Sequence, residues 1–371
     1  MKPRIYVLGN GAYDSPTGRR ARGLFSEDLL DCYNVKIAYR KEKNFKTPVK
    51  FVFDILKFKP QILYLVKMGW TTGITGLYFR LFTRVRVIID TGDIVSELMK
   101  TLGHNWIIVF LSALFERLVM RSSHSVVVRG TYYKKFLITR GFTNVTLIQD
   151  GVDTEVMHAI NVEKKRKELL LDKVLTVGIC GSLIWNKRLN MCYGSEIVEL
   201  INILKDRPVV GIIIGDGTGL SYLKQKVKEY GIEKKILFPG TFKYEELPKW
   251  LTIIDICVST QTNDIVGKVR TTAKLVDYLA CGRYILATDV GEAKLVLPEE
   301  MRIEYIDTED KLYPEKLAKK IIEILKSPAI LQKGKNGINI AKQKFEYKIL
   351  REKLSFLLRG EPLCGEPLKT L

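Results

Sequence analysis

The chain has 371 residues, which suits two domains of ordinary size better than one compact core. With 46% hydrophobic and 27% charged residues it should bury an extensive core, which excludes a largely disordered protein. Its formal net charge of +19 predicts attraction to a polyanion, which is nucleic acid, an anionic membrane surface or a phosphorylated substrate.

Cysteine and histidine lack the spacing of a metal site. No two cysteines form a C-x-x-C pair and four lie in apolar stretches, so we expect reduced residues of a cytoplasmic protein. The first apolar run, Arg4 to Leu8, is too short for a signal peptide. We therefore expect no secretory leader, no metal and no cofactor. The residues concerned are Cys32, Cys180, Cys192, Cys257, Cys281, Cys364, His104, His124 and His158.

Short apolar runs alternate with helical patterns along the first half, which predicts a parallel sheet with crossover helices. The predicted strands are Arg4 to Leu8, Val35 to Ala38, Ile62 to Val66, Val85 to Ile89, Ser125 to Val128 and Val145 to Ile148.

The loop after the first strand begins with Gly9-Asn10-Gly11. The third glycine of a dinucleotide fingerprint would fall at Asp14, so we do not expect NAD binding. The loop continues through Ser15-Pro16-Thr17-Gly18 into a basic helix predicted over Arg19 to Leu30. Gly18 is therefore either a glycine that lets backbone approach a phosphate or a simple turn residue.

The segment from Lys36 to Lys59 is strongly basic and carries interleaved apolar residues. Its only acids are Glu42 and Asp54. Such a segment can lie on anionic lipid headgroups, or it can be an ordinary amphipathic helix with a solvated face. The interleaved residues are Phe45, Val49, Phe51, Phe53 and Ile55.

Polar residues follow the strand that begins at Val85. Asp90 and Asp93 lie at its carboxyl end, where open α/β sheets bind ligands, and both are candidates for acceptor contacts. His104 follows in a loop, either as a residue that binds the donor sugar or assists the acceptor, or as a structural residue.

An apolar helix is then predicted over Trp106 to Phe115, closed by Glu116 and Arg117. It is too short to span a bilayer, so we expect a core helix, with an interfacial helix as the alternative.

The charged segment from Glu163 to Lys173 predicts a domain boundary, after which the strand and helix alternation restarts. Each strand runs into a loop rich in small residues, and such loops line ligand sites at one edge of a parallel sheet. The predicted strands are Leu175 to Ile179, Val209 to Ile214, Ile236 to Phe238, Asp255 to Val258 and Tyr284 to Ala287. The loops include Gly181 to Arg188, Gly215-Asp216-Gly217 and Pro239-Gly240.

The stretch from Arg270 to Leu286 predicts a loop, an amphipathic helix and a strand, with Gly282 as the left-handed cap. Lys274 and Asp277 are three apart on the first turns of that helix, where free amides from Thr272 onward favour an anion. A cation with amides suits a diphosphate, and the carboxylate suits sugar hydroxyls. The alternative is a solvated ion pair on a surface helix.

Several runs occur in an order that resembles a known enzyme family. They are V-G-I-C-G-S-L-I-W-N-K-R, I-I-I-G-D-G-T-G-L, I-L-F-P-G-T-F, L-T-I-I-D-I-C-V-S-T and T-A-K-L-V-D-Y-L-A-C-G-R-Y-I-L-A-T-D-V-G. Together they resemble the nucleotide-sugar domain of the retaining glycosyltransferases of family four, also called glycosyl transferases group 1. In the first half, Q-D-G-V-D is similar to that family's N-G-V-D, and S-P-T-G to its N-terminal glycine loop. The resemblance covers nearly the whole chain.

The resemblance implies a GT-B fold, in which two Rossmann-like α/β domains with parallel sheets face each other across a cleft. It implies donor contacts from Gly18, Gly181, Gly215, Asp216, Phe238, Thr272, Lys274, Leu275 and Asp277, with Asp277 on the ribose. Lys187 would grip the donor diphosphate and count with His104 and Asp93 among the catalytic candidates. The resemblance implies that the leaving phosphate itself takes the acceptor's proton, so a protein base is optional. Fixed cations and helix amides can stabilise the phosphate charge, so we expect no metal.

Two positions depart from the family pattern. The first glutamate of the family's paired-glutamate motif would fall at Val269, so its carboxylate is missing or comes from Asp264. The family's arginine beside the phosphate-binding lysine would fall at Ser182, and Arg188 or Arg270 can replace its charge.

We therefore expect an acceptor domain over residues 1–160, a donor domain over 161–345 and, over 346–371, the end of a final helix that crosses back to the first domain, followed by a mobile tail. That helix is predicted over Leu331 to Leu358. The expected activity is hexosyl transfer from a nucleoside-diphosphate sugar to a glycan or lipid-linked acceptor, in the cytoplasm or at the inner face of the membrane. The alternatives are a GT-B protein that transfers nothing, such as an epimerase, and a basic nucleic-acid-binding protein, whose motifs are absent.

Overall fold

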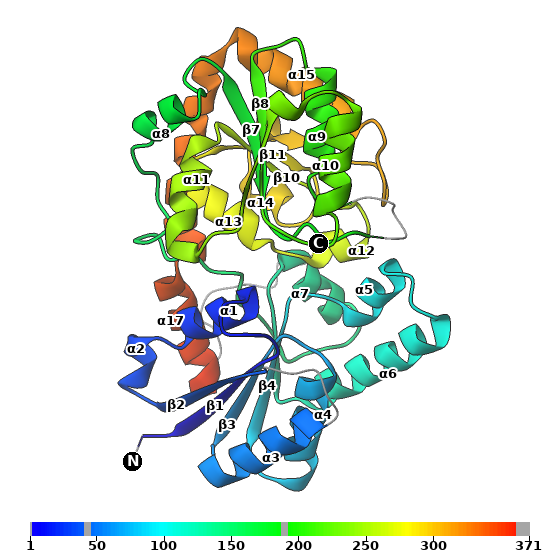
Figure 1. Ribbon diagram of the computed structural model, residues 1–371. Coiled ribbons are helices and arrows are strands. Elements are labelled where there is room, and N and C mark those ends of the chain that lie inside the picture. Colours follow the sequence, from blue (N-terminus) through cyan, green and yellow to red (C-terminus); the bar gives the residue numbers. More distant parts are fainter. Residues whose placement is uncertain (1, 41–45, 187–191, 361–371) are drawn as a thin grey trace. The chain divides into compact units, whose positions relative to one another are not determined.

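The computed structural model describes residues 2–40, 46–186 and 192–360 (Figure 1). Its contacts divide the chain into two compact units. Unit 1 contains Met1–Gly151, Val269–Thr271 and Phe345–Leu371, and unit 2 contains Val152–Lys268 and Thr272–Lys344. The division thus falls between Gly151 and Val152, whereas the sequence placed it after residue 160.

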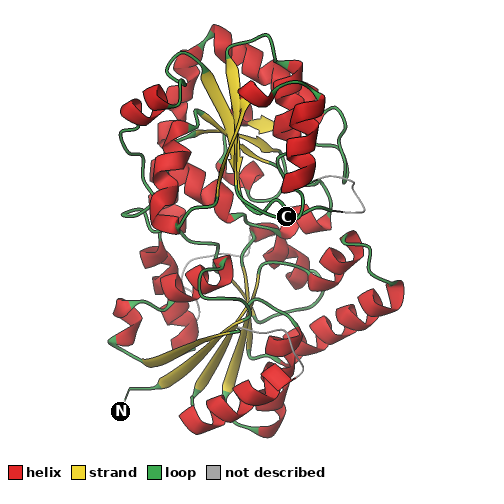
Figure 2. Cartoon of the chain, in the orientation of Figure 1, coloured by secondary structure: helices red, strands yellow, loops and turns green. Residues whose placement is uncertain are grey.

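Unit 1 is built on one parallel sheet of six strands in the order β2-β1-β3-β4-β5-β6, with helices on both faces (Figure 2). The strands are β1 (Arg4–Gly9), β2 (Asn34–Tyr39), β3 (Ile62–Val66), β4 (Arg86–Thr91), β5 (Ser125–Val128) and β6 (Val145–Leu147). The helices are α1 (Pro16–Leu24), α2 (Glu27–Leu30), α3 (Lys46–Phe58), α4 (Trp70–Phe82), α5 (Val95–Thr101), α6 (Trp106–Ser122), α7 (Thr131–Ile138) and α17 (Tyr347–Arg359).

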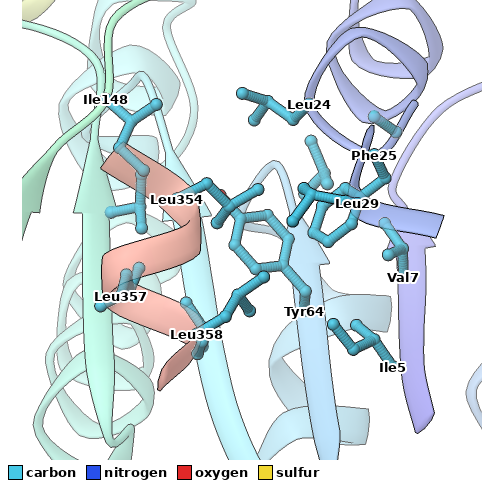
Figure 3. Packing of buried hydrophobic residues seen from close by; sticks show 14 of the residues in the cluster. Ile5, Val7, Leu24, Phe25, Leu29, Tyr64, Ile148, Leu354, Leu357 and Leu358 are labelled. Carbon is cyan, nitrogen blue, oxygen red and sulfur yellow. The ribbon is translucent and has the colours of Figure 1, made fainter. Parts of the chain in front are cut away.

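Helix α17 completes the core of unit 1 on one face of the sheet. Figure 3 shows Leu354 and Leu358 beside the buried Tyr64 of β3. The helix fits closely because a Cβ at Gly23 would lie only 2.3 Å from the Tyr347 ring. At its other end, Arg86 donates to the carbonyls of Leu357 at 2.7 Å and Leu358 at 2.9 Å, which satisfies acceptors that the helix leaves free.

Unit 2 repeats the architecture with a parallel sheet of six strands in the order β12-β11-β10-β7-β8-β9. The strands are β7 (Leu175–Cys180), β8 (Val209–Ile214), β9 (Ile236–Gly240), β10 (Ile256–Ser259), β11 (Tyr284–Thr288) and β12 (Arg302–Ile303). The helices are α8 (Glu163–Glu168), α9 (Ser195–Ile203), α10 (Leu220–Glu229), α11 (Leu247–Ile253), α12 (Ile265–Val269), α13 (Ala273–Ala280), α14 (Ala293–Val296), α15 (Tyr313–Lys326) and α16 (Asn336–Ile340).

The two six-stranded parallel sheets confirm the predicted α/β class with two Rossmann-like domains. All strands of each sheet point the same way, so their carboxyl ends gather at one edge. Each unit therefore offers one edge at which loops after successive strands can build a site.

Three predicted helices differ from the structure. The helix predicted over Arg19 to Leu30 is two helices, and the first starts at Pro16 because the Ser15 side chain caps it by accepting from Gly18 N–H. The long final helix is a succession of short turns up to Phe345 followed by α17. Within these turns Gly334 packs closely against β11, since a Cβ there would be 2.5 Å from the nitrogen of Tyr284.

The third difference concerns α6, which the sequence analysis expected to be a core helix ending at Phe115. It runs on to Ser122, and much of its apolar surface is exposed. Glu116 does not close it but is buried, since its carboxylate accepts from the N–H groups of Val95 at 2.9 Å and Ser96 at 3.2 Å. Glu116 thereby caps α5, and burial raises the pKa of its carboxyl.

Candidate functional site

The carboxyl edge of the unit 1 sheet is organised around Asp90 at the end of β4. Its carboxylate is fully buried and accepts from Arg20 Nε at 2.7 Å, Tyr64 Oη at 2.8 Å and Arg129 Nε at 3.0 Å. Burial alone would raise the pKa of Asp90, but the charges of Arg20 and Arg129 lower it. Asp90 is therefore ionised and enclosed, and it is not placed to contact an acceptor as expected.

Arg20 extends this network to the last strand of the sheet. Its guanidinium is buried and also donates to the carbonyls of Gln149 at 2.5 Å and Ile148 at 2.7 Å. Sequence reasoning missed Arg20, although it stands four residues before the buried Leu24 on the inner face of α1. The ion pairs hold the ends of β3, β4 and β5 in fixed relation.

Asp93 lies just beyond β4 and pairs with Arg270, whose Nε is 2.5 Å from Asp93 Oδ1. Burial alone would raise the pKa of Asp93, but Arg270, Lys67 and Arg129 lower it. Asp93 is consequently ionised and a weak base, which suits a hydrogen-bond acceptor better than a proton acceptor. Arg270, a predicted donor contact, belongs to unit 1 by its contacts and pairs there with Asp93.

The residues beside Arg270 also belong to unit 1. Thr271 Oγ1 donates to the carbonyl of Arg129 at 2.6 Å. Val269, which stands where the family has a glutamate, is fully buried against Gly130, whose Cβ would come 2.3 Å from the Val269 carbonyl oxygen. An acidic side chain at this position would therefore lose its solvation.

Two further predicted residues of unit 1 lie at turns of the chain. His104 is exposed between α5 and α6, where its backbone N–H donates to the carbonyl of Met99 at 3.1 Å. Gly18 lies in the first turns of α1, and a Cβ there would be 2.0 Å from the carbonyl oxygen of Tyr13. Glycine at this position therefore allows the preceding loop to press onto the helix, while its N–H bonds to Ser15 Oγ at 3.3 Å.

At the carboxyl edge of unit 2, backbone contacts join the loops that follow β7, β8 and β9. The N–H of Gly181 donates to Ile214 and that of Gly215 donates to Gly240, each at 2.9 Å. A Cβ at Gly215, whose φ is +142°, would lie 1.9 Å from the Gly181 carbonyl oxygen. The predicted glycines thus permit two loops to touch through their backbones.

Helix α13 adds a cation to these loops. Lys274 on its first turn lies over Gly181, where a Cβ would be 3.3 Å from Lys274 Cδ. Its Nζ is 4.1 Å from the centroid of the Tyr193 ring, a cation–π contact. Thr272 is the N-cap of α13 and makes no side-chain cap bond to the helix. This cluster of Gly181, Lys274 and helix amides, here called the anion pocket, suits a phosphate group.

Asp277 lies one turn further along α13 and is only 5% exposed. The hydroxyl of Tyr244, from the turn that follows β9, donates to Asp277 Oδ1 at 3.4 Å. Asp277 and Lys274 are therefore not a solvated surface pair. Leu275 between them is buried and anchors the helix in the unit 2 core.

The remaining predicted residues lie around this cluster or outside the described chain. Asp216 accepts from the N–H of Gly217 at 2.7 Å and so shapes its own loop. Phe238 in β9 is partly buried, with Lys224 Nζ 5.9 Å from its ring centroid. Lys187 and Arg188 lie outside the described residues, as does the predicted mobile tail. Within the described residues, no group of three or more His, Cys, Asp or Glu side chains could hold a metal ion.

Comparison with known proteins connects this geometry to a class of enzymes. Residues 174–327, most of unit 2, match the family model described as glycosyl transferases group 1. This match covers the anion pocket and Asp277, and it makes the enzyme class that of a glycosyltransferase. No curated protein matches the chain in sequence.

Solved structures resemble the whole chain at low sequence identity. Sucrose-phosphate synthase from Thermosynechococcus elongatus has a TM-score of 0.77 and 16% identity, over 97% of this chain and 99% of that one. HepE from Anabaena, in complex with UDP and glucose, has a TM-score of 0.74 and 15% identity, over 97% of this chain and 100% of that one. The lipopolysaccharide outer core galactosyltransferase WaaB has a TM-score of 0.59 and 12% identity, over 96% and 99%. These likenesses confirm the GT-B fold.

Proposed function

We propose, from the premise that the chain is a glycosyltransferase with a group 1 domain, that it transfers a sugar from a nucleoside-diphosphate sugar with retention of configuration. The observation that carries the proposal is the anion pocket of unit 2, in which Lys274 lies over Gly181 with Asp277 buried one turn beyond. This set offers a cation and amides to a diphosphate and a carboxylate to sugar hydroxyls.

The proposed chemistry follows from where charge develops. As the carbon–oxygen bond to the nucleoside diphosphate breaks, negative charge grows on the phosphate oxygens. Lys274 and the first amides of α13 stabilise that charge without rearranging, an effect worth about 3 kcal/mol for one donor at comparable oxyanion sites. The leaving phosphate then takes the proton of the acceptor hydroxyl, so no protein base is required, and on this proposal Lys274 and the amides take the place of a metal.

On this proposal, Asp93 of unit 1 orients the acceptor by accepting a hydrogen bond, because its lowered pKa makes it a poor base. We propose a glycan or lipid-linked precursor as the acceptor and a place at the inner face of the membrane. The UDP and glucose bound to HepE, and the lipopolysaccharide named for WaaB, support these classes of donor and acceptor.

The first test is thermal stabilisation by a panel of nucleoside diphosphates and nucleotide sugars, beginning with UDP. A ligand at about a hundred times its dissociation constant should add about 2.7 kcal/mol of stability. Lys274→Ala and Asp277→Ala should weaken the response, while Lys234→Ala, an exposed lysine of unit 2, should leave it unchanged. A panel without any response would contradict the proposal.

Transfer is tested separately from binding. With an acceptor in hand, the anomeric proton of the product in its NMR spectrum should show the donor's configuration, and excess EDTA should not slow the reaction. Inversion would exclude the proposed mechanism, and loss of activity in EDTA would exclude metal independence. Stabilisation by nucleotide sugars without any transfer would favour a binding protein or an epimerase.

A further inference from the structure

Three helices of unit 1 lie next to one another on one face of the sheet. Helix α4 contacts both α3 and α6 (Figure 1). The connections through them lead from β2 to β3, β4 and β5, which advance in one direction across the sheet. Right-handed crossovers therefore place all three on the same face, and their outward sides form one surface.

Helix α6 is inverted relative to an ordinary amphipathic helix. Its outward side carries Ile107, Leu111, Leu114 and Leu118 at spacings of four, three and four residues, and all four are exposed. Trp106 at its start is 74% exposed and Phe110 is 62% exposed. Toward the protein it buries Ser112 and Glu116, and near its end Val119 and Met120. The protein core therefore does not cover the outward apolar stripe of this helix.

Helix α4 shows the same inversion. Apart from Phe79 it buries threonines and glycines, and it exposes Trp70, Ile74, Leu81 and Phe82. The ring of Trp70 stacks on Phe115 of α6 with centroids 4.6 Å apart, so the exposed surfaces of the two helices are continuous. A monomeric soluble protein seldom exposes so large an apolar surface without a partner for it.

Helix α3 extends this surface with a mixture of apolar and basic residues. It exposes Val49, Phe53 and Leu56 at helical spacing, with Lys46, Lys50 and Lys57 also exposed. Ile55 packs into unit 1, so α3 is an amphipathic helix whose solvent side carries apolar residues as well as lysines. We call the outward sides of α3, α4 and α6 the apolar–basic face.

The charge of the apolar–basic face identifies its partner. The three helices carry six basic residues and two acids. Asp54 is neutralised by Lys36 at 2.7 Å, and Glu116 is buried, so neither acid offsets the exposed lysines and arginines. In a two-fold dimer through this face the same cations would meet each other and repel. An anionic lipid surface instead accepts both the apolar side chains and the charge.

We propose that the apolar–basic face docks unit 1 onto an anionic membrane, with the side chains of α4 and α6 inserted among the lipids at the interface. No helix in the described part of the chain is long and apolar enough to cross a membrane. This contact is the membrane association that the proposed function includes. It depends only on residues of unit 1, so it can be tested without measuring sugar transfer.

The test is binding of the full chain to vesicles of phosphatidylcholine with about a third phosphatidylglycerol, compared with phosphatidylcholine alone. The chain has four tryptophans, of which Trp70 and Trp106 lie on the face and Trp185 and Trp250 lie in unit 2. Brominated lipids should quench tryptophan fluorescence, and the double variant Trp70→Phe, Trp106→Phe should lose that quenching. Unchanged quenching in this variant would overturn the proposed orientation.

Two pairs of substitutions measure the apolar and the electrostatic contribution to vesicle binding separately. Leu114→Glu with Leu118→Glu should lower vesicle partitioning at least about ten-fold, because two inserted side chains become charged. Lys50→Ala with Lys57→Ala should lower it about five-fold for each charge removed. Leu295→Glu, a 56% exposed leucine of unit 2, is the matched control and should bind like the wild type.

Two outcomes would overturn the proposal. One is equal binding by the wild type and the Leu114, Leu118 variant. The other is a wild-type dimer that ignores vesicles and becomes monomeric in that variant, which would make the face a contact between copies. Thermal stabilisation of the same variants by nucleotides should stay as in the wild type. It therefore tests the proposed donor binding independently of membrane binding.

Discussion

The two units use the same architecture but hold the functional edge of the sheet by different physical means. In unit 1 the edge is fixed by buried charges, with Asp90 between Arg20 and Arg129. In unit 2 it is fixed by close backbone contacts at glycines, with the loops after β7 and β8 touching at Gly181 and Gly215.

The two edges differ in which of their polar groups can still contact a ligand. At the unit 1 edge Arg20, Tyr64 and Arg129 enclose the carboxylate of Asp90, so it cannot also serve a ligand. At the unit 2 edge the glycines bring the backbones of two loops together beside Lys274. A buried charged network is thus the support of one edge, whereas close backbone packing supports the edge at which we propose that an anion binds.

The largest predicted effect is that of removing the carboxylate from the unit 1 edge. Asp90→Ala removes the carboxylate nearest to the buried Arg20 and leaves it only Asp150, 3.6 Å from its Nη1, which should destabilise unit 1 by about 3–5 kcal/mol. Hydrogen exchange of β4 and β5 amides measures this loss within unit 1. Asp289→Ala removes an acid that is 30% exposed in unit 2 and should cost less than about 1 kcal/mol. Equal costs would show that the buried network does not support the edge.

The second prediction removes the close contact from the unit 2 edge. Gly215→Ala places a Cβ 1.9 Å from the Gly181 carbonyl oxygen, so the loops must separate at a cost of about 2–3 kcal/mol. The variant should also lose stabilisation by nucleotides. Gly231→Ala is the control, since Gly231 has φ of +66° with nothing within 4 Å and should cost only about 1 kcal/mol. An intact nucleotide response in Gly215→Ala would remove the loop from the proposed site.

The sequence predicted the strands well because apolar runs bounded by glycine and polar residues depend only on local pattern. The strand over Ser125 to Val128 matches β5 residue for residue, and Gly282 has the left-handed φ of +59° expected after α13. The pattern at Lys274 and Asp277 also led to residues that the structure brings together with the glycine loops. Local sequence was sufficient to predict the place of a residue wherever one helix or one turn determines it.

The sequence failed where the answer depends on partners distant in the chain. Arg20 and Asp90 are seventy residues apart, and nothing local shows that they pair. The exposure of α6 was missed for a related reason. An apolar helix pattern shows that the residues avoid water, but it does not show whether the protein core or another surface covers them.

The third prediction concerns the pH dependence of the stability that Asp90 gives to the unit 1 edge. The folded state lowers the pKa of Asp90 below its unfolded value of about 3.9, so its contribution is complete above that value. It is lost only as the pH falls through the lower folded pKa. Protection of β4 amides, corrected for intrinsic exchange, should therefore be constant from about pH 7 to 5 and fall below about pH 4. Asp90→Asn should be less stable throughout and show a flatter profile, and a profile identical in shape to the wild type would assign the pH response to other groups.

The smallest predicted effect concerns the tie between α13 and the glycine loops. The hydroxyl of Tyr278 accepts from the N–H of Cys180 at 2.8 Å, immediately before Gly181. Tyr278→Phe leaves that buried amide unpaired, which should cost about 1 kcal/mol in urea unfolding and weaken nucleotide stabilisation. Tyr284→Phe, at a second buried tyrosine of unit 2, controls for the loss of a hydroxyl. If both substitutions weaken the nucleotide response equally, the bond to Cys180 does not position the loop, and backbone packing at Gly215 alone holds the unit 2 edge.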